Sequence, residues 1–232
     1  MNPLALVTGT SSGIGAAIAR RLLADGWQVV GWDRADATIA HPRFDAQALD
    51  LCDGACIDAS IDALFDSGAP HAFVHAAGVL RIAALGDLQP DDGELMWRVH
   101  VQAATRIANA VLPAMRAAQR GRVVLIGSRV SHGMPGRSQY AASKAALVAL
   151  ARSWAAEVVA DGVTVNLIAP AATDTPMLAD PQRAASAPRL PPIGRLIQPD
   201  EVAALAAFLL SPDAAAITGQ EIAICGGASL PR

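Results

Sequence analysis

The chain has 232 residues, of which 53% are hydrophobic and 17% charged, and its formal net charge is -3. This composition predicts a well-packed globular protein and argues against disorder. The slightly acidic balance of charge provides no basic surface for nucleic acid. No apolar run approaches the roughly 18 residues that a membrane span needs, and no basic leader precedes the first apolar run. We therefore expect no nucleic-acid partner, no membrane partner and a cytoplasmic location.

Short apolar runs alternate with longer amphipathic stretches along the chain. This alternation is typical of a parallel sheet with helices on both faces, here a doubly wound α/β sheet of about seven strands in one domain over residues 1–232. We expect strands at Leu4–Thr8, Gln28–Asp33, Phe44–Ala48, His71–Ala76, Arg122–Ser128, Thr164–Ile168 and Gln220–Cys225. We expect helices from Ile14 to near Gly26, through Ile57, Ile61 and Leu64, and at about Asp91–Ala118, Ser138–Ala160 and Pro199–Leu210.

The segment Pro170–Gln198 is rich in proline, which excludes a continuous helix or a central strand. It follows the carboxyl end of a predicted strand, where ligands bind in sheets of this kind. Long loops in compact domains are usually functional, so we expect a lid over a substrate site at about 171–198. A disordered surface insertion is the alternative.

A loop of small residues joins the first strand to the first helix and reads Thr8-Gly9-Thr10-Ser11-Ser12-Gly13-Ile14-Gly15. Small residues allow the backbone amides at a helix N-terminus to approach a pyrophosphate, which the helix dipole also attracts. The spacing G-x-x-x-G-x-G differs from the commoner G-x-G-x-x-G, and a purely structural tight turn is the alternative.

Asp33 ends the second predicted strand, 18 residues after Gly15. At about this interval a carboxylate accepts hydrogen bonds from the adenosine ribose hydroxyls. The same carboxylate would repel a 2′-phosphate, so Asp33 favours NAD over NADP, although Arg34 beside it could hold such a phosphate. Asp33 could also merely end the strand.

Tyr140 is the only tyrosine of the chain and Lys144 its only lysine, and they lie four residues apart on a predicted helix. Residues at this spacing share one helix face. An ammonium about 5.5 Å from a phenol, at an effective dielectric constant of about 20, favours the phenolate by about 3 kcal/mol, or roughly two pKa units. The pair therefore predicts an acid/base site in which Tyr140 exchanges a proton with a substrate.

Ser128 ends the fifth predicted strand and could donate a hydrogen bond to the reacting oxygen. Alternatively, it is a turn residue that only ends the strand. Ser131 is a minor rival for the same role.

Several ordered motifs together resemble the short-chain dehydrogenase/reductase family, over essentially the whole chain. They are the glycine loop, His75-Ala76-Ala77-Gly78, Ser128 with Tyr140-x-x-x-Lys144, Asn166 through Pro170 with Thr175, and Gly219 with Gly226-Gly227. The resemblance implies a Rossmann-type fold, a homotetramer, and NAD(H)-dependent hydride transfer between nicotinamide and a secondary alcohol or ketone. NADP is the less favoured cofactor.

The resemblance also implies which residues contact the cofactor. Asp50 and Leu51 would flank the adenine, and Val99 would lie near the ribose. The implied cofactor contacts are Gly9, Ser11, Ser12, Gly13, Ile14, Gly15, Asp33, Asp50, Leu51, Ala76, Ala77, Gly78, Val99, Tyr140, Lys144, Pro170, Thr173 and Thr175.

The sequence departs from the family pattern in three places. His100 lies where the family commonly has an asparagine that supports a proton path from the lysine, so His100 either relays protons or is a packed core residue. His75-Ala76 replaces a frequent pair of asparagines, and Cys225 replaces an aspartate. We expect the catalytic set to be Ser128, Tyr140 and Lys144, with His100 as a candidate member.

The three cysteines do not form a metal-ligand pattern, and we expect no metal site. Cys52 and Cys56 are interpreted as small core residues, and a catalytic thiol at Cys225 is an alternative without an evident base. Two other functions remain open. One is an NADPH-dependent ketone or 3-oxoacyl reductase, and the other is a non-catalytic dinucleotide-sensing scaffold, against which the intact Ser128, Tyr140 and Lys144 argue.

Overall fold

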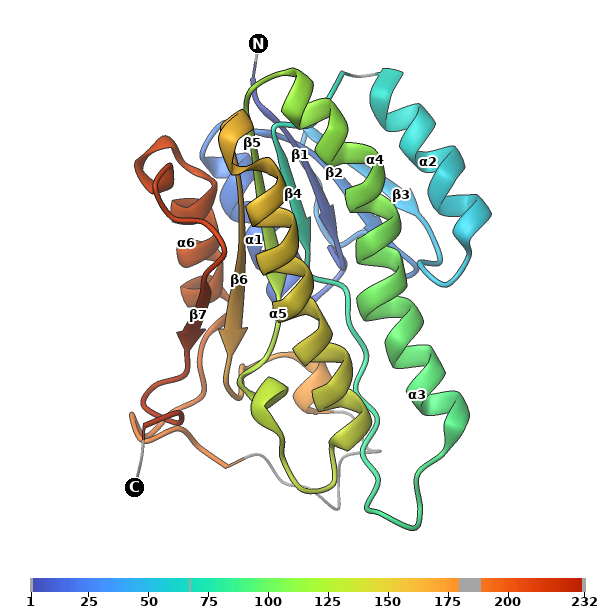
Figure 1. The fold of residues 1–232 in the computed structure, drawn as a ribbon, viewed down its shortest axis with the longest axis vertical. Coiled ribbons are helices and arrows are strands. Elements are labelled where there is room, and N and C mark those ends of the chain that lie inside the picture. Colours follow the sequence, from blue (N-terminus) through green and yellow to red (C-terminus); the bar gives the residue numbers. More distant parts are fainter. Residues whose placement is uncertain (1, 67, 180–188, 231–232) are drawn as a thin grey trace.

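The computed structural model describes residues 2–66, 68–179 and 189–230. Its strands form one parallel seven-stranded sheet in the order β3-β2-β1-β4-β5-β6-β7 (Figure 1), which confirms the predicted fold class. The strands are β1 (Leu4–Thr8), β2 (Gln28–Asp33), β3 (Phe44–Ala48), β4 (Ala72–His75), β5 (Gly121–Ile126), β6 (Val163–Pro170) and β7 (Glu221–Ile224).

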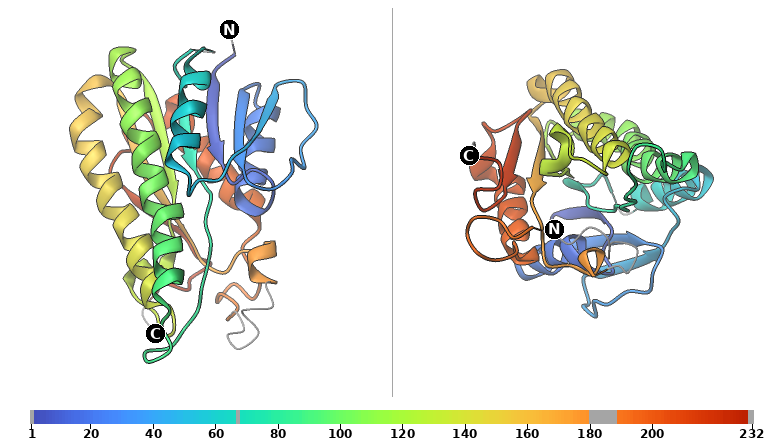
Figure 2. Two further views of the ribbon diagram at one scale, coloured as in Figure 1. Left: turned by 90° about the vertical axis from the view of Figure 1, so that its right-hand side faces the viewer. Right: turned by 90° about the horizontal axis from the view of Figure 1, so that it is seen from below.

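Helices cover both faces of the sheet (Figure 2). Helices α1 (Gly13–Ala24) and α6 (Pro199–Leu210) pack together on one face, while α2 (Gly54–Asp66), α4 (Ala103–Ala117) and α5 (Ser138–Val158) pack on the other. The central strands β1 and β4 are buried along their whole length. Strands covered on both faces are expected to be apolar throughout, which explains the continuous hydrophobic runs in the sequence.

The strand order reverses between β1 and β4, which are neighbours in the sheet. From β1 the chain proceeds outward to β2 and β3, then returns to β4 and proceeds outward in the other direction to β7. The loops that leave the carboxyl ends of β1 and β4 therefore diverge and open a crevice between them. The glycine loop and the segment after β4 both lie at this crevice.

The long helix predicted at Asp91–Ala118 is interrupted. The structure has α3 (Pro90–Trp97), a π-helical segment Arg98–Gln102, and then α4. Hydrophobic periodicity does not reveal a π-helical turn, because the turn adds only one residue to a pattern that stays helical. Such turns are frequent at functional sites.

Strands β4 to β7 differ from the prediction by one or two residues at their ends, and two of these differences affect candidate site residues. Strand β5 ends at Ile126, so Ser128 lies beyond the strand, where it caps a short 3-10 helix, Arg129–His132. Strand β6 continues to Pro170, which pairs in register with Ile224 of β7. Pro170 therefore ends a strand and does not begin an irregular segment. A proline is tolerated at a strand end because few ladder bonds are lost there.

The segment after β6 is described only in part. Thr173 and Ile197 form an isolated parallel bridge that holds its two ends together, and Pro176–Leu178 forms a 3-10 helix. Residues 180–188, at the centre of the predicted lid, lie outside the described residues. The lid therefore stays a prediction.

The prediction that Cys52 and Cys56 are small core residues is wrong. Cys56 is exposed, and Cys52 and Cys225 are partly exposed. Cys56 lies in the first turn of α2 and is exposed, whereas the next residue, Ile57, packs inward. Among the described helices, none is long and apolar enough to cross a bilayer.

Candidate active site

A cavity of about 490 Å³ opens at the carboxyl ends of β1, β2 and β4. It brings together most of the residues that were predicted to bind a dinucleotide. The predicted residues that line it are Gly9, Ser11, Ser12, Gly13, Ile14, Gly15, Asp33, Asp50, Leu51, Ala76, Ala77, Gly78, Val99 and Thr175. Tyr140, Lys144, Pro170 and Thr173 are not part of this lining.

Other residues line the same cavity that were not among the predicted cofactor contacts, although Arg34 was considered as a ligand of a 2′-phosphate. They are Trp32, Arg34, Ala35, Asp36, Thr38, Leu49, Cys52, Val79, Leu95, Pro176 and Met177. Several of them directly follow or precede a predicted contact in sequence, as Arg34 follows Asp33 and Cys52 follows Leu51. Extending each predicted contact along its loop would have found these, whereas Leu95 on α3 carries no sequence signal.

Two positions of the first loop require glycine, because neighbouring backbone atoms leave no room for a Cβ atom there. Gly9 has φ +77°, and a Cβ atom there would lie 2.8 Å from the Cα atom of Ala77. A Cβ atom at Gly15 would lie 2.1 Å from the carbonyl oxygen of Gly9. These positions admit only glycine, so the N-terminus of α1 comes close to the crevice with its first amides facing it. This cradle fits the pyrophosphate of a dinucleotide.

Asp33 is held in place at the edge of the cavity. One carboxylate oxygen accepts from the amide of Ser11 at 2.9 Å, and the other accepts from the amide of Ala35 at 3.0 Å. Each carboxylate oxygen has a second lone pair that can accept a hydroxyl hydrogen. The carboxylate can therefore receive ribose hydroxyls without losing its own supports.

Tyr140 and Lys144 lie together in the first turns of α5, and both are buried. The Nζ atom of Lys144 donates to the carbonyl oxygen of Ile126 at 2.9 Å, at the end of β5. Burial lowers the pKa of Lys144 to about 7. Tyr140 packs in an apolar cluster with Leu80 and Val130, so the phenol and the ammonium occupy a region of low dielectric.

The two candidate serines have different partners. Ser128 Oγ accepts from the amide of Val130 at 3.2 Å, which leaves its hydroxyl hydrogen for another acceptor. Ser131 Oγ donates to the carboxylate of Glu221 on β7 at 3.0 Å. Because the hydrogen of Ser131 is already engaged, the geometry favours Ser128 for contact with a reacting oxygen.

Two buried histidines flank the segment after β4. His75 lies between Thr8 and the carbonyl oxygen of Val99, and His100 lies between the amide of Val79 and Ser143. Burial lowers the pKa of His75 to about 3 and that of His100 well below its usual value. His100 thus has the packed, hydrogen-bonded arrangement that was one of its two predicted alternatives.

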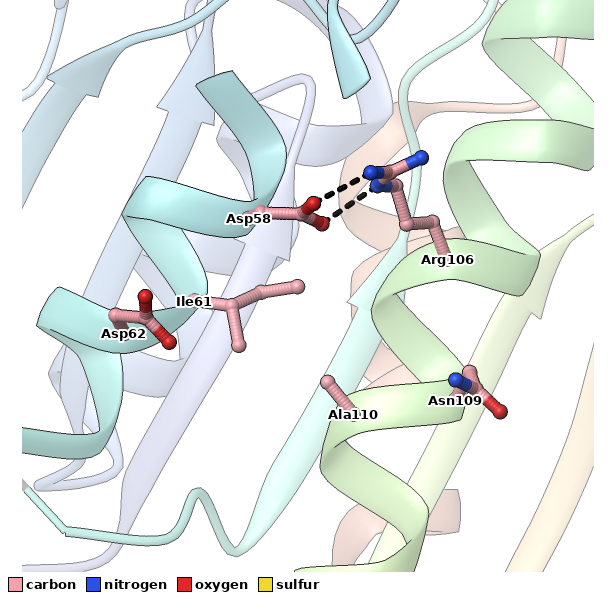
Figure 3. Close-up of a pocket in the computed structure, with 6 residues that line it drawn as sticks. All are labelled: Asp58, Ile61, Asp62, Arg106, Asn109 and Ala110. Atoms are coloured by element: carbon pink, nitrogen blue, oxygen red, sulfur yellow. Dashed lines mark hydrogen bonds and ion pairs between the residues drawn. The ribbon is translucent and has the colours of Figure 1, made fainter. Parts of the chain in front are cut away.

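A second hollow, of about 410 Å³, lies between α2 and α4 (Figure 3). Arg106 points across it and forms a two-point ion pair with Asp58. This pair is exposed and already satisfied. The hollow shares no residue with the crevice and contains none of the predicted site residues, so we do not consider it a candidate active site.

Comparisons with known proteins agree with this geometry. The family model described as enoyl-(acyl carrier protein) reductase matches residues 9–229. A solved structure described as a short chain dehydrogenase/reductase family protein is 33% identical, covers 97% of this chain and 96% of its own, and superposes with a TM-score of 0.87. The chain belongs to the short-chain dehydrogenase/reductase family.

Other relatives cover the chain equally well. The 3-oxoacyl-(acyl-carrier-protein) reductase FabG of Vibrio harveyi is 36% identical over 97% of this chain and 96% of its own length. The ligand-free aldohexose dehydrogenase of Thermoplasma acidophilum is 27% identical, covers 100% of this chain and 95% of its own, and has a TM-score of 0.90. This short-chain dehydrogenase/reductase is therefore an oxidoreductase, of a family that binds a nicotinamide cofactor and acts on small molecules.

Proposed function

We propose that the protein is an NAD(H)-dependent oxidoreductase that interconverts a secondary alcohol and a ketone. The observation that carries this proposal is the buried pair of Tyr140 and Lys144. The pair lies beside the segment after β4, which lines the cavity. Gly78 joins the two regions, because it lines the cavity and its Cβ position lies 3.6 Å from Lys144 Nζ.

A nicotinamide cofactor held in the crevice would provide the hydride chemistry at the substrate carbon. Tyr140 takes the hydroxyl proton of the alcohol during oxidation, or gives a proton to the carbonyl oxygen during reduction. Lys144 holds positive charge near the phenol and stabilises its ionised form. Ser128 donates a hydrogen bond to the reacting oxygen and stabilises the charge that develops there.

Residues of this chain would hold the cofactor along the crevice. The amides at the start of α1 would bind the pyrophosphate, and Asp33 would accept hydrogen bonds from the adenosine ribose. Asp33 supports NAD because a carboxylate repels a 2′-phosphate, whereas Arg34 in the same lining is the residue through which NADPH would be accommodated. Direct comparison of NADH and NADPH dissociation constants tests this preference.

A second candidate function is favoured by the comparisons. The relatives that are named 3-oxoacyl-(acyl-carrier-protein) reductase match nearly the full length of the chain. The same catalytic set would reduce a 3-oxoacyl thioester with NADPH. A panel of secondary alcohols with NAD and of 3-oxoacyl thioesters with NADPH, followed by the absorbance of the reduced nicotinamide, separates the two functions.

A third candidate, a dinucleotide-sensing scaffold without catalysis, makes a different prediction in the same assay. It requires tight NAD binding without hydride transfer to any member of either panel. The burial of Tyr140 beside Lys144 supports catalysis, because a scaffold has no need to place an ammonium in an apolar region, where burial costs free energy.

We also propose that the chain forms one domain over residues 1–232 and a homotetramer. The continuous sheet supports one domain. The outward side of α5 supports assembly, since it has exposed alanines at positions 142, 149 and 156 where solvated helices usually have charges. Light scattering tests the assembly, and a stable monomer would contradict it.

A further inference from the structure

Two buried histidines face the segment Ala76–Val79 from opposite ends, and their hydrogen-bond partners determine which ring nitrogen bears the proton. The segment connects β4 to the loop beside Tyr140 and lines the cavity throughout. A ring nitrogen that meets a carbonyl oxygen must donate, and one that meets a backbone amide must accept. The donor or acceptor role of each ring nitrogen can therefore be assigned from the backbone groups that it meets, because the roles of those groups are known.

His75 has a hydrogen on Nε2. The hydroxyl oxygen of Thr8 accepts from the amides of Ala76 and Ala77, each at 3.1 Å, which uses both of its lone pairs. Its own hydrogen is therefore directed to Nδ1 of His75 at 3.0 Å, and Nε2 donates to the carbonyl oxygen of Val99 at 3.1 Å. The ring is neutral and links β1 to the π-helical segment.

His100 has the opposite arrangement. Its Nε2 atom accepts from the amide of Val79 at 3.0 Å, so the proton of the neutral ring lies on Nδ1 and is donated to Ser143 Oγ at 2.9 Å. Ser143 in turn donates to the carbonyl oxygen of Tyr140 at 2.9 Å. A continuous chain of hydrogen bonds thus runs from the segment after β4 to the backbone of the tyrosine.

The ring of His100 also packs directly against Tyr140. The ring of His100 meets that of Tyr140 edge-on, with centroids 5.6 Å apart and planes at 85°. A Cβ atom at Gly78 would lie 3.2 Å from His100 Nε2. The histidine therefore fixes the distance between the cavity wall at Gly78 and the helix that presents Tyr140.

We propose that His75 and His100 form a pair of neutral histidines in opposite tautomers that fasten the segment Ala76–Val79 in place, and that His100 is a positioning residue for Tyr140 and not a proton relay. A relay through His100 would require a second proton on Nε2, where the amide hydrogen of Val79 already points. Val99 and His100 are consecutive residues of the π-helical segment. The same segment therefore provides the carbonyl oxygen that His75 contacts and the ring that accepts from the amide of Val79. The kinetic part of this inference rests on the proposed function, whereas the tautomers do not.

The tautomers can be measured without any substrate. In the protein labelled with ¹⁵N-histidine, long-range ¹H–¹⁵N correlation spectra distinguish Nδ1–H from Nε2–H, and single variants assign the five histidines. We expect Nε2–H at His75 and Nδ1–H at His100, both unchanged between about pH 5.5 and 8, because burial, and after it the positive charge of nearby Lys144, lowers the pKa of both rings. The opposite tautomer at either ring, or titration of His100 in this range, would overturn the proposal.

Kinetics separate positioning from relay. In His100→Gln the side-chain carbonyl can still accept from Val79 but cannot carry a proton through, so we expect turnover within about threefold of the native enzyme. We expect His100→Ala to lose about 10- to 100-fold in kcat, because small displacements of reacting groups have effects of this size. His71→Asn is the matched control, since His71 Nδ1 also accepts a backbone amide, that of Leu4, at the opposite end of the sheet.

Two kinetic outcomes would refute the positioning role. One is His100→Gln turning over as slowly as His100→Ala, with an altered solvent isotope effect, which a relay predicts. The other is a His100→Ala enzyme of native activity. Absence of turnover in the native protein with every substrate would instead contradict the proposed function, and the spectra would still decide the tautomers.

Discussion

Lys144 Nζ lies 5.8 Å from the centre of the Tyr140 ring, and the exposed fractions of the two residues are 4% and 8%. This relationship is the physical basis of the proposed chemistry, because a cation in a poorly solvated region favours the phenolate more strongly than the same cation in water. The ammonium does not need to contact the phenol to have this effect.

Tyr140→Phe removes the proposed proton donor and acceptor and little else, since the ring and its packing remain. We expect kcat to fall by at least about 100-fold, the lower range for loss of a positioned acid/base group. The dissociation constant for NADH, measured by quenching of tryptophan fluorescence, should stay within a factor of two to three. Full turnover in this variant would disprove the assigned role.

Lys144→Met removes an amine that is costly to bury. The pKa of Lys144 is lowered from its usual value to about 7 in the folded protein, so the unfolded chain binds more protons between about pH 7 and 10.5. The native protein should therefore gain stability as pH rises through this interval. We expect the cofactor-free variant to melt at a higher temperature than the native protein, with the largest difference at or below pH 7 and a smaller one near pH 10. A difference independent of pH would show that Lys144 is not buried as an ammonium.

Asp33→Asn keeps the shape of the side chain and removes its charge. Without the repulsion of a 2′-phosphate, the ratio of NADPH to NADH dissociation constants should fall by about tenfold, equivalent to about 1.4 kcal/mol. Isothermal titration calorimetry measures both constants. Asp213→Asn, on an exposed short helix after α6, is the control and should leave the ratio unchanged.

Gly9→Ala tests the close approach of the first loop to the segment after β4. The added methyl group would meet the backbone of Ala77 and occupy a left-handed conformation. Gly26→Ala is the matched control because Gly26 also has a positive φ, +92°, but nothing lies within 4 Å of its Cβ position. We expect a loss of about 1–2 kcal/mol in Gly26→Ala from backbone strain alone, and about 1–3 kcal/mol more in Gly9→Ala from the collision. Equal losses in urea unfolding would show that the loop can move aside.

Buried neutral histidine makes the protein sensitive to acid. The pKa of His75 is lowered from 6.5 to about 3 on folding, so stability is fully present above pH 6.5 and is lost as pH falls toward 3. The contribution is about 1.4 kcal/mol per pH unit. His75→Asn removes the titrating group, and its urea-unfolding free energy should depend less steeply on pH between about 4 and 6. A native slope in His75→Asn would show that His75 does not cause the acid sensitivity.

Much of the fold was predictable because its signals are local. Strands β1, β2 and β3 and helix α6 have the boundaries that the sequence predicts, since hydrophobic runs and the Gln198-Pro199 helix start depend on neighbouring residues only. The break between α3 and α4 was not predictable. Its π-helical turn is held by long-range contacts, including that of His100 with Val79, which no local window contains.

The candidate site shows the same division. Spacing along one helix was enough to place Tyr140 and Lys144 on a common face, whereas the choice between Ser128 and Ser131 depended on Glu221, which is distant in sequence. The role of His100 likewise depended on which groups meet each ring nitrogen.

The sequence by itself determined the order of strands and helices, the family, and the chemical groups available at the crevice, because periodicity and motif spacing are properties of contiguous segments. Only the tertiary structure decided which loops meet, which hydroxyl hydrogens are engaged, how far Lys144 is removed from water and which tautomer each buried histidine has. These properties arise from contacts between strands and helices far apart in the chain, and their energies depend on burial, which a linear sequence does not specify.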